Sequence, residues 1–310
     1  MEILSLPALV PAMAMGNTCV ALGFFDGVHR GHTAVLLAAA ARARALGLSF
    51  LVYTFAMADA PKADAPLLST DAERAALFAS IGADYCVFDN FSAARTTPPE
   101  RFVREALSQT LGARLAVVGE DFRFGYRAAG DAALLCTLMA ECGGEAVVIP
   151  PVSLGGAPIS SSRIRAALAS GDVTEVAALL GRPYALTLPV CHGKALGRTI
   201  GFPTANQALP DGRALPADGV YVTECTTADG RTVRGVTDIG LRPTVSGRKR
   251  RMETHLIDFS GDLYGQTITV DFLSFLRAER RFDSIDALAE QVHADIKQAK
   301  TILQTKGFFR

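Results

Sequence analysis

Short apolar runs alternate with helix-length segments over the first half of the chain, and this alternation restricts the possible fold more than any other feature. The apolar runs are residues 20–22, 48–55, 84–88, 115–118 and 146–149. The segments between them have helical periodicity, and the first two end at Gly47 and Gly82. Strands that alternate with helices of this length imply right-handed crossovers and a parallel sheet covered on both faces. The sequence therefore predicts an α/β domain.

The pattern changes at Tyr184, where short β-rich runs separated by Gly, Pro and Asp turns begin and continue to about Leu276. These runs have no helix-length periodicity between them, which indicates an antiparallel barrel. Residues 284–303 then carry apolar side chains at helical spacing and predict one closing amphipathic helix. A chain of 310 residues is long for one compact domain, so we expect two, formed by residues 1–182 and 183–310.

The turn that joins the first strand to the first helix, residues 20–32, reads VALGFFDGVHRGH. Gly23 and Gly27 allow the backbone to turn tightly, and His29 and His32 lie three residues apart at the start of the helix. Unpaired N–H groups and the helix dipole favour an anion at that place. Two histidines also occur in ordinary turns, but their spacing here favours a site for the triphosphate of ATP.

Two further stretches have the polar residues that a nucleotide site needs. Residues 118–125 read VGEDFRFG and follow a strand, at the edge of the sheet where ligands bind. An ordinary polar loop with its phenylalanines turned inward would have the same pattern. Residues 159–165 read ISSSRIR and precede an apolar helical segment. Serines at such a place are most often helix caps, but hydroxyls followed by an arginine also suit a phosphate.

The second half contains two stretches with the residue types that phosphoryl transfer needs. Residues 197–206 read GRTIGFPTAN, in which the Thr204 hydroxyl and the Asn206 amide oxygen are hard ligands suited to Mg²⁺. Residues 252–265 read METHLIDFSGDLYG, and Glu253 is a carboxylate able to accept the proton of a substrate hydroxyl. A Gly/Pro turn and a glutamate on a strand surface also occur without such a role, so the assignment depends on the motifs being considered together.

Together these stretches resemble the bacterial bifunctional riboflavin kinase/FAD synthetase family, from about Val20 to Lys300. GFFDGVHRGH contains the HxGH signature of nucleotidyltransferases, and GEDFRFG, ISSSRIR and GRTIGFPTAN are similar to further motifs of the family in the family's order. Class I aminoacyl-tRNA synthetases share the short HxGH form, but the chain has no Lys-rich KMSKS loop. Its formal net charge of zero also argues against a broad nucleic-acid surface.

The resemblance implies a nucleotidyltransferase-type, Rossmann-like domain followed by a riboflavin kinase barrel, and it implies roles for individual residues. The implied catalytic residues are His29, His32, Arg165 and Glu253. The implied ATP-binding residues are Gly23, Phe25, Asp26, Gly27, His29, His32, Ser161, Ser162, Arg165, Gly197, Thr204 and Asn206. The implied flavin-binding residues are Phe55, Asp121, Phe124 and Arg277. Thr204 and Asn206 are also the implied ligands of Mg²⁺, which would bind with ATP.

The resemblance also implies that the second half phosphorylates riboflavin to FMN and the first half adenylylates FMN to FAD with release of pyrophosphate. The FMN phosphate would attack the α-phosphorus of ATP, so positioning and charge stabilisation suffice without a side-chain nucleophile. Two alternatives are a riboflavin kinase with a weak or inactive adenylyltransferase half, and a non-catalytic flavin-binding regulator. Binding alone explains poorly why Thr204, Asn206 and Glu253 occur together.

The chain departs from the family after the second predicted strand. The family commonly has Phe-x-Pro-His-Pro there, whereas this chain reads Phe55-Ala56-Met57-Ala58-Asp59. The segment lacks the imidazole and the two rigid prolines, and Asp59 brings negative charge toward anionic substrates. Lys62 is a nearby residue that would supply an equivalent contact in a shortened loop. We expect the adenylyltransferase half to be weaker than the kinase half.

Six cysteines are scattered without a CxxC pair, which favours reduced thiols in a cytoplasmic protein over a disulfide framework or a zinc site. The amino terminus is apolar, but Glu2, Pro7 and Pro11 and the absence of a basic leader argue against an export signal. No apolar run approaches the roughly 18 residues of a membrane helix. The sequence therefore predicts a soluble cytoplasmic enzyme whose partners are ATP, riboflavin, FMN and FAD, not nucleic acid or a membrane.

Overall fold

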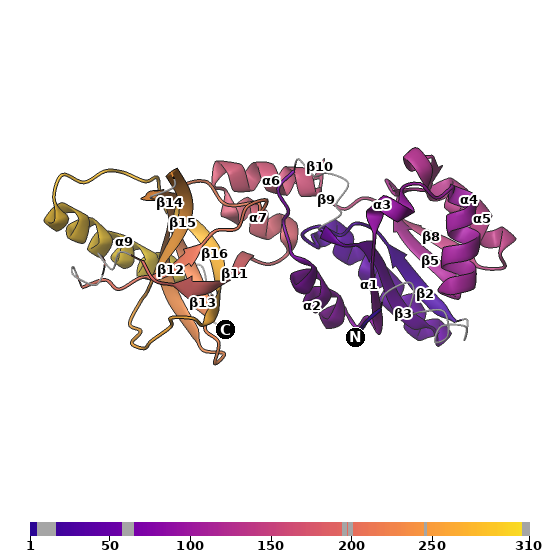
Figure 1. The fold of residues 1–310 in the computed structure, drawn as a ribbon, viewed down its shortest axis with the longest axis horizontal. Coiled ribbons are helices and arrows are strands. Elements are labelled where there is room, and N and C mark those ends of the chain that lie inside the picture. The colour runs from indigo at the N-terminus through magenta and orange to yellow at the C-terminus, as the bar shows by residue number, and fades with distance from the viewer. Residues whose placement is uncertain (5–16, 58–64, 194–196, 198–200, 245–246, 306–310) are drawn as a thin grey trace. The chain divides into compact units, whose positions relative to one another are not determined.

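The computed structural model describes residues 1–4, 17–57, 65–193, 197, 201–244 and 247–305 (Figure 1). Contacts between residues divide the chain into two compact units, Met1–Ser161 and Ser162–Arg310. The first unit contains a parallel sheet with helices and the second a closed barrel, so the predicted fold class is confirmed. The functional boundary expected between residues 182 and 183 is still a prediction.

The first unit is built on one sheet of six parallel strands in the order β1-β4-β3-β2-β5-β8. The strands are β1 (Glu2–Leu4), β2 (Thr18–Leu22), β3 (Ser49–Phe55), β4 (Tyr85–Asp89), β5 (Ala113–Gly119) and β8 (Glu145–Ile149). β2 lies between β3 and β5. Because these three strands are parallel, the loops that follow them share one edge of the sheet.

Helices cover both faces of this sheet (Figure 1). The helices of the first unit are α1 (Arg30–Leu46), α2 (Asp71–Ile81), α3 (Phe91–Ala94), α4 (Pro99–Arg101), the π-helix η3 (Phe102–Thr110) and α5 (Ala132–Glu141). Leu36 of α1 and Phe78 of α2 join the core on one face, whereas Leu107 of η3 and Leu135 of α5 join the core on the other. The alternating side chains of each buried strand therefore enter two separate cores.

The helix ends follow the predicted signals, with one difference in helix type. Gly47 and Gly82 end α1 and α2 in the left-handed conformation, with φ of 63° and 96°. The segment between the third and fourth apolar runs is helical, as expected, but its longest part, Phe102–Thr110, is a π-helix. The Leu111 N–H bonds to the Ala106 carbonyl, five residues earlier, at 2.9 Å. The apolar pattern predicted a helix correctly but did not distinguish its period.

β1 is an element that the sequence pattern does not predict. Its three residues pair with Tyr85, Cys86 and Val87 of β4 at the edge of the sheet. Glu2 and Ile3 are both exposed, so the strand has no alternation of buried and exposed side chains. A pattern of apolar and polar residues therefore does not reveal it. Pairing with β4 therefore creates this strand, and pairing depends on residues far away in the sequence.

The second unit contains a closed antiparallel barrel with the strand order β11-β12-β15-β14-β13-β16. The strands are β11 (Tyr184–Cys191), β12 (Ala205–Ala208), β13 (Gly219–Thr226), β14 (Thr232–Thr244), β15 (Gly247–Leu256) and β16 (Thr267–Arg277). Ala299 and Leu303 of α9 (Ile285–Thr305) pack with Val220 and Val222 of β13. The predicted barrel and its closing helix are therefore confirmed.

Two helices, α6 (Ser161–Ser170) and α7 (Val173–Leu180), precede the barrel. α7, which the sequence pattern did not predict, contacts β11 and β16. The Leu168 carbonyl of α6 accepts a hydrogen bond from the Ala217 N–H at 2.9 Å. Both α6 and α7 are therefore in contact with the barrel unit.

The remaining short elements are β6 (Arg123–Phe124), η4 (Tyr126–Ala128), β7 (Gly130–Asp131), β9 (Ser153–Leu154) and β10 (Ala157–Pro158).

All six cysteines are free thiols, as the sequence predicts. Burial raises the pKa of Cys19, Cys86 and Cys225 to about 12. Thiols of such high pKa are poor nucleophiles, so these three are inert core side chains.

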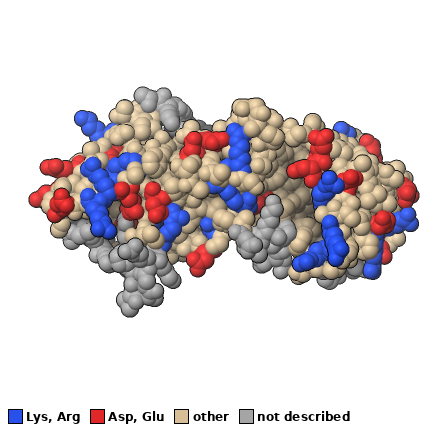
Figure 2. Space-filling view, turned by 90° about the horizontal axis from the view of Figure 1, so that it is seen from above, with Lys and Arg blue, Asp and Glu red and all other residues tan. Residues whose placement is uncertain are grey.

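The surface charges are mixed. On the face seen in Figure 2, the Lys and Arg side chains are interspersed with Asp and Glu and do not gather into one broad patch. Over the part of the chain that the structure describes, no helix combines the length and apolar character that crossing a membrane requires.

Candidate active sites

The turn after β2 has an unusual backbone. Phe25, Gly27 and Val28 have positive φ values of 52°, 80° and 40°. A positive φ is unfavourable for residues with a Cβ, and such conformations concentrate at functional sites. The Phe25 and Val28 side chains are buried, which anchors the turn in the core. These two buried side chains hold the turn at the amino terminus of α1.

His29 and His32 form a stacked pair at the start of α1. Their ring centroids are 3.6 Å apart and their planes differ by 17°. His29 caps the helix, because its Nδ1 accepts a hydrogen bond from the His32 backbone N–H at 3.2 Å. With Nδ1 acting as acceptor, the ring N–H of His29 is the one on Nε2, which is then a donor. The structure therefore brings the two predicted imidazoles together at a helix amino terminus.

His32 is held in its neutral form. Burial lowers the pKa of His32 well below its usual range, and electrostatic interactions with His29 and Arg74 lower it further. In the described part of the chain, His32 Nδ1 is buried and has no hydrogen-bond partner. His32 is therefore uncharged at neutral pH.

We expect acid to destabilise the protein through His32. An unfolded histidine titrates near pH 6.5, whereas folded His32 stays neutral to lower pH. The unfolded state therefore binds the extra proton below that pH, and the free energy of unfolding falls as the pH is lowered. Urea unfolding at about pH 7 and about pH 5.5 should show the wild type losing about 1 kcal/mol more than His32→Asn. Equal losses in the two proteins would contradict a neutral His32.

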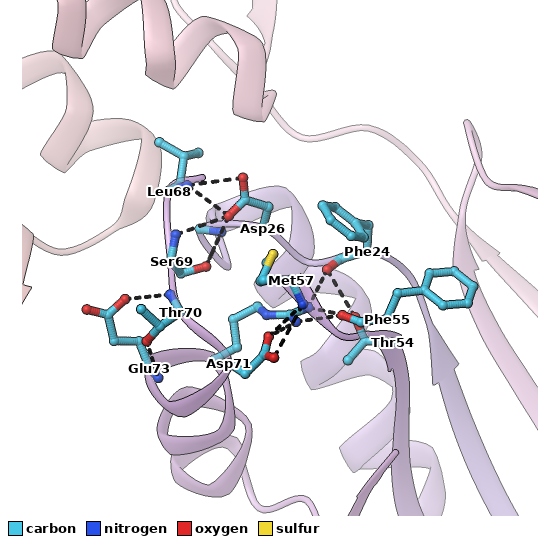
Figure 3. A network of polar contacts seen from close by, with 12 residues as sticks. Phe24, Asp26, Thr54, Phe55, Met57, Leu68, Ser69, Thr70, Asp71 and Glu73 are labelled. Carbon is cyan, nitrogen blue, oxygen red and sulfur yellow. Dashed lines mark hydrogen bonds and ion pairs between the residues drawn. The ribbon is translucent and has the colours of Figure 1, made fainter. Parts of the chain in front are cut away.

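Asp26 organises the loop beside the turn. The residue is 1% exposed, and its carboxylate accepts the Leu68 N–H at 3.0 Å, the Ser69 N–H at 3.1 Å and the Ser69 hydroxyl at 3.1 Å (Figure 3). Ser69 Oγ in turn accepts the Gly27 N–H at 2.8 Å. The Ser161 hydroxyl donates to the Asp26 backbone carbonyl at 3.0 Å. Asp26 therefore joins three segments of the first unit, and its contact with ATP is still a prediction.

The predicted flavin residues of the first unit follow the strands on either side of β2. Phe55 ends β3 and Asp121 follows β5, so both lie at the edge of the sheet that carries the turn. Asp121 is exposed, whereas Phe124 is buried and packs against Phe102 and Phe122. The structure brings Phe55 and Asp121 to one edge and places the Phe124 ring in the core. Their contacts with a flavin are not tested by this arrangement.

Hydrogen bonds hold the start of the segment that stands in place of Pro-His-Pro. Met57 occupies the place of the first proline, and its N–H donates to the Asp71 carboxylate at 3.1 and 3.3 Å. The Ala56 N–H donates to the Asp89 carbonyl at 3.0 Å. Ala58, Asp59 and Lys62 lie outside the described residues. The described part of the segment is therefore tied to α2 and β4.

The ISSSRIR stretch forms the start of α6, as its serines predict. Ser161 is the first residue of the helix and bonds to Asp26. Ser162 and Arg165 follow within the first two turns and belong to the second unit. Arg163, which has no predicted role, pairs with Glu175 of α7 at 2.8 Å. The approach of Ser162 and Arg165 to a nucleotide is still a prediction.

One row of side chains crosses the strands of the barrel. Asn206 on β12 is directly opposite Glu253 on β15, and Glu253 is opposite Asp238 on β14. The row continues through Val220 on β13 to Arg277 on β16. Directly opposite residues of antiparallel strands project from the same face of the sheet. Because Val220 packs with α9, this row lies on the face that α9 covers, and it brings the predicted metal ligand and the predicted base together.

Thr204 and Asn206 present two hard oxygens. Asn206 Nδ2 donates to the Thr204 hydroxyl at 3.2 Å, which makes Oδ1 the acceptor of the amide. A Cβ on Gly193 would lie 2.4 Å from Asn206 Oδ1, and a Cβ on Gly197 would lie 2.3 Å from the Phe202 carbonyl. Glycine at both positions therefore allows the loop to approach these residues closely. A hydroxyl and an amide oxygen fit a hard cation such as Mg²⁺.

His255 has no predicted role, yet it holds the loop around Pro203. Its Nδ1 hydrogen bonds to the Pro203 carbonyl at 2.9 Å, and the proton lies on Nδ1 because a carbonyl only accepts. The Phe202 ring packs edge-on against His255, with centroids 5.5 Å apart, and against His293 of α9 at 4.6 Å. His255 lies two residues from Glu253 and so on the same strand face. That spacing is the sequence signal that would have identified it.

Arg277 is bound to the closing helix. Its guanidinium donates to the buried Asp295 carboxylate at 3.0 and 2.8 Å, and Gln291 donates to the same carboxylate at 2.7 Å. Arg277 therefore attaches β16 to α9 at one end of the row that contains Glu253. Its contact with a flavin is still a prediction.

Comparison with known proteins covers both units. A family model described as FAD synthetase matches residues 12–163, and one described as riboflavin kinase matches residues 180–303. The bifunctional riboflavin kinase/FMN adenylyltransferase of Escherichia coli (strain K12) is 39% identical over 282 residues, which cover 88% of this chain and 89% of that protein. The protein of the same name from Bacillus subtilis (strain 168) is 32% identical over 294 residues, with 91% and 92% covered.

A solved structure has a similar fold over almost the whole chain. A crystal structure described as a macrolide-efflux protein from Streptococcus pneumoniae has a TM-score of 0.86 and 32% sequence identity, and it covers 97% of this chain and 99% of that one. The likeness therefore includes both the parallel sheet and the barrel.

Proposed function

Because the chain belongs to the bifunctional riboflavin kinase/FMN adenylyltransferase family, we propose how its residues divide the two reactions. The protein phosphorylates riboflavin to FMN and adenylylates FMN to FAD. Residues 1–182 carry out the adenylylation and residues 183–310 the phosphorylation. The order of the two matched regions, residues 12–163 and 180–303, supports this division.

Glu253 is the general base of riboflavin phosphorylation. Its carboxylate accepts the proton of the riboflavin hydroxyl as that oxygen attacks the γ-phosphorus of ATP, and the bond from the γ-phosphorus to the bridging oxygen breaks to release ADP. The observation that carries this assignment is the row in which Asn206 stands opposite Glu253 on the face covered by α9. A base and a metal ligand on neighbouring strands are close enough to serve one phosphoryl group, because neighbouring strands lie about 4.8 Å apart.

ATP-dependent transfer in this family needs a divalent metal ion, and we propose Mg²⁺ as that ion. Thr204 and Asn206 would hold it through their side-chain oxygens, and it would neutralise charge on the phosphates of ATP. The oxygen-only donor set of this pair fits Mg²⁺ better than a softer metal. His255 keeps the preceding loop in place through the Pro203 carbonyl.

The opening turn binds the phosphates of ATP during FAD synthesis. The N–H groups at the start of α1 and the Nε2–H of His29 point to an anion site, and His32 stacks on His29. Arg165, Ser161 and Ser162 stabilise the pyrophosphate as it leaves. Phe55, Asp121 and Phe124 hold the flavin at the edge of the sheet, so that the FMN phosphate meets the α-phosphorus of ATP. Positioning and charge stabilisation carry this reaction.

We expect His255→Ala to lower riboflavin phosphorylation about tenfold, because losing a hydrogen bond to the Pro203 carbonyl loosens the loop that carries Thr204. His255→Asn keeps an N–H near the place of Nδ1 and should retain most of the activity. Both variants should form FAD from supplied FMN at the wild-type rate, which makes the second reaction an internal control. The measurement is the steady-state rate of riboflavin phosphorylation by the two variants. If His255→Ala and His255→Asn lose equal activity, the Nδ1 hydrogen bond has no role in this reaction.

Because the Pro-His-Pro segment is missing, we expect FAD synthesis to be slower than riboflavin phosphorylation. This observation favours the alternative of a riboflavin kinase with a weak adenylyltransferase half. The described part of the segment, Ala56 and Met57, offers no imidazole to a substrate. The rate of FAD formation from supplied FMN should be lower than the rate of FMN formation from riboflavin at the same ATP concentration. FMN should therefore accumulate before FAD in a time course that starts from riboflavin. FAD appearing as fast as riboflavin disappears would show that the segment is dispensable.

We also propose that the small molecules ATP, riboflavin, FMN and FAD are the partners of the protein, and that it works in the cytoplasm. Six free thiols support a reducing compartment. The mixed surface charge in Figure 2 and the formal net charge of zero support the expectation that nucleic acid is not a partner.

A further inference from the structure

Arg74 of α2 hydrogen bonds to four residues that are labelled in Figure 3, namely Phe24, Thr54, Phe55 and Asp71. Among the described residues it is the largest side chain that is fully buried. Its two terminal nitrogens donate to the Phe24 carbonyl at 2.7 Å, the Thr54 hydroxyl at 2.8 Å, the Phe55 carbonyl at 2.6 Å and the Asp71 carboxylate at 2.5 Å. Figure 3 shows Phe24, Thr54, Phe55 and Asp71 converging on one point. One guanidinium therefore connects three separate segments of the first unit.

The two carbonyls bound by Arg74 belong to the turn and to the strand end that the proposed function assigns to ATP and FMN. Phe24 lies in the turn that leads from β2 to His29, and Phe55 is the last residue of β3. The Thr54 hydroxyl also donates to the Phe24 carbonyl at 3.0 Å. The phosphate-binding turn and the end of β3 are thus held to each other through the same oxygen.

Stability alone does not explain a buried arginine at this position. The Arg74 side chain is fully buried, whereas the side chain of its partner Asp71 is 40% exposed, so the guanidinium loses its hydration and gains only a solvent-screened ion pair. Arg74 Nε is also buried and has no hydrogen-bond partner in the described part of the chain. An apolar side chain in α2 would fill the same space without either penalty. The planar fork of arginine, however, binds two carbonyl oxygens at fixed positions.

The Arg74–Asp71 pair also holds the place where the family has its first proline. Asp71 receives the Met57 N–H at 3.1 and 3.3 Å, and a proline at position 57 would have no N–H to donate. Arg74 fixes the Phe55 carbonyl two residues earlier. In this chain, hydrogen bonds from α2 therefore constrain the backbone that follows β3.

We propose that Arg74 is a positioning residue for FAD synthesis, which keeps the phosphate-binding turn and the end of β3 in register so that ATP and FMN are aligned for attack. This inference rests on the proposed function of the first unit. Arg74 itself touches neither substrate and acts through the Phe24 and Phe55 carbonyls. Asp71 supports it by fixing the guanidinium and the Met57 N–H.

The test uses the full chain and compares Arg74→Met and Arg74→Lys with Arg104→Met, which removes an exposed arginine of the same unit that pairs with Glu141. The kcat and the KM for ATP and FMN are measured for FAD formation from supplied FMN. Riboflavin phosphorylation and a melting curve of each sample check that the protein is intact. A misaligned reacting pair lowers kcat about 10²-fold, so we expect that loss in Arg74→Met and about tenfold in Arg74→Lys. Both KM values should change less than about threefold, and Arg104→Met should behave as the wild type.

A kcat within about threefold of the wild type in both Arg74 variants would overturn the proposal. So would raised KM values with an unchanged kcat, since that pattern reports lost binding without lost alignment. If Arg74→Met does not fold, Arg74→Lys, which keeps the charge and lacks the fork, decides the question alone. A wild type that makes no FAD would instead overturn the proposed function of the first unit.

Discussion

Replacing Glu253 by Gln should abolish FMN formation from riboflavin while FAD formation from supplied FMN stays nearly intact. The amide cannot accept the proton of the riboflavin hydroxyl, and loss of a general base typically lowers the rate about 10²- to 10⁴-fold. The substitution keeps the shape of the side chain, so the pairing of β15 with β12 and β14 is preserved. Separate assays with riboflavin and with FMN as substrate measure the two activities.

Glu224→Gln is the matched control for this experiment. Glu224 also lies on a strand of the barrel and is partly buried, but it stands opposite Asp271 and outside the row that contains Glu253. It should leave both activities unchanged. If FMN formation and FAD formation fall together in Glu253→Gln, the assignment of Glu253 to phosphorylation alone is wrong.

Replacing His29 and His32 together by Ala should lower FAD synthesis on the order of 10²-fold or more, since comparable charge-stabilising groups contribute that much. Riboflavin phosphorylation should survive. The measurement is the rate of FAD formation from supplied FMN at saturating ATP. Unchanged FAD synthesis would mean that the stacked histidines only complete the turn.

The alanine at position 29 also removes the cap of α1, which typically destabilises a helix by about 1 kcal/mol. His29→Asn separates the two effects, because an asparagine oxygen caps the His32 N–H but leaves no group in the place of Nε2. We expect His29→Asn to melt near the wild-type temperature and still to lose most FAD synthesis. Full activity in this variant would assign His29 to capping alone.

The order of the elements is predictable because local signals encode it. Gly47 and Gly82 end helices in a conformation that other residues adopt less easily, and Thr70 with Glu73 begins α2 with a capping box. The short runs after Tyr184 carry the turn residues of a barrel. Each of these features depends on a few neighbouring residues, so the sequence alone identifies them.

Other features depend on pairing between distant segments, which local patterns do not encode. Asn206 meets Glu253 because β12 pairs with β15 in one register, and the resemblance to a family was needed to associate them. β1 is recognised only through its partner β4. Arg74 lies in a helix where a charged residue normally faces solvent, and its burial follows from carbonyls on two other segments.

The surroundings of individual site residues likewise depend on distant segments. The structure places the Phe124 ring beside Phe102 and binds the Arg277 guanidinium to Asp295 of α9. The predicted contacts of both residues with a flavin are still predictions.

The central claim is that one chain makes FAD from riboflavin in two steps. Chromatography of the flavins after incubation of the purified protein with riboflavin, excess ATP and Mg²⁺ tests it most directly. FMN should appear first and FAD should follow, with pyrophosphate released in proportion to FAD. Recovery of riboflavin alone, or of FMN that never becomes FAD, would contradict the claim.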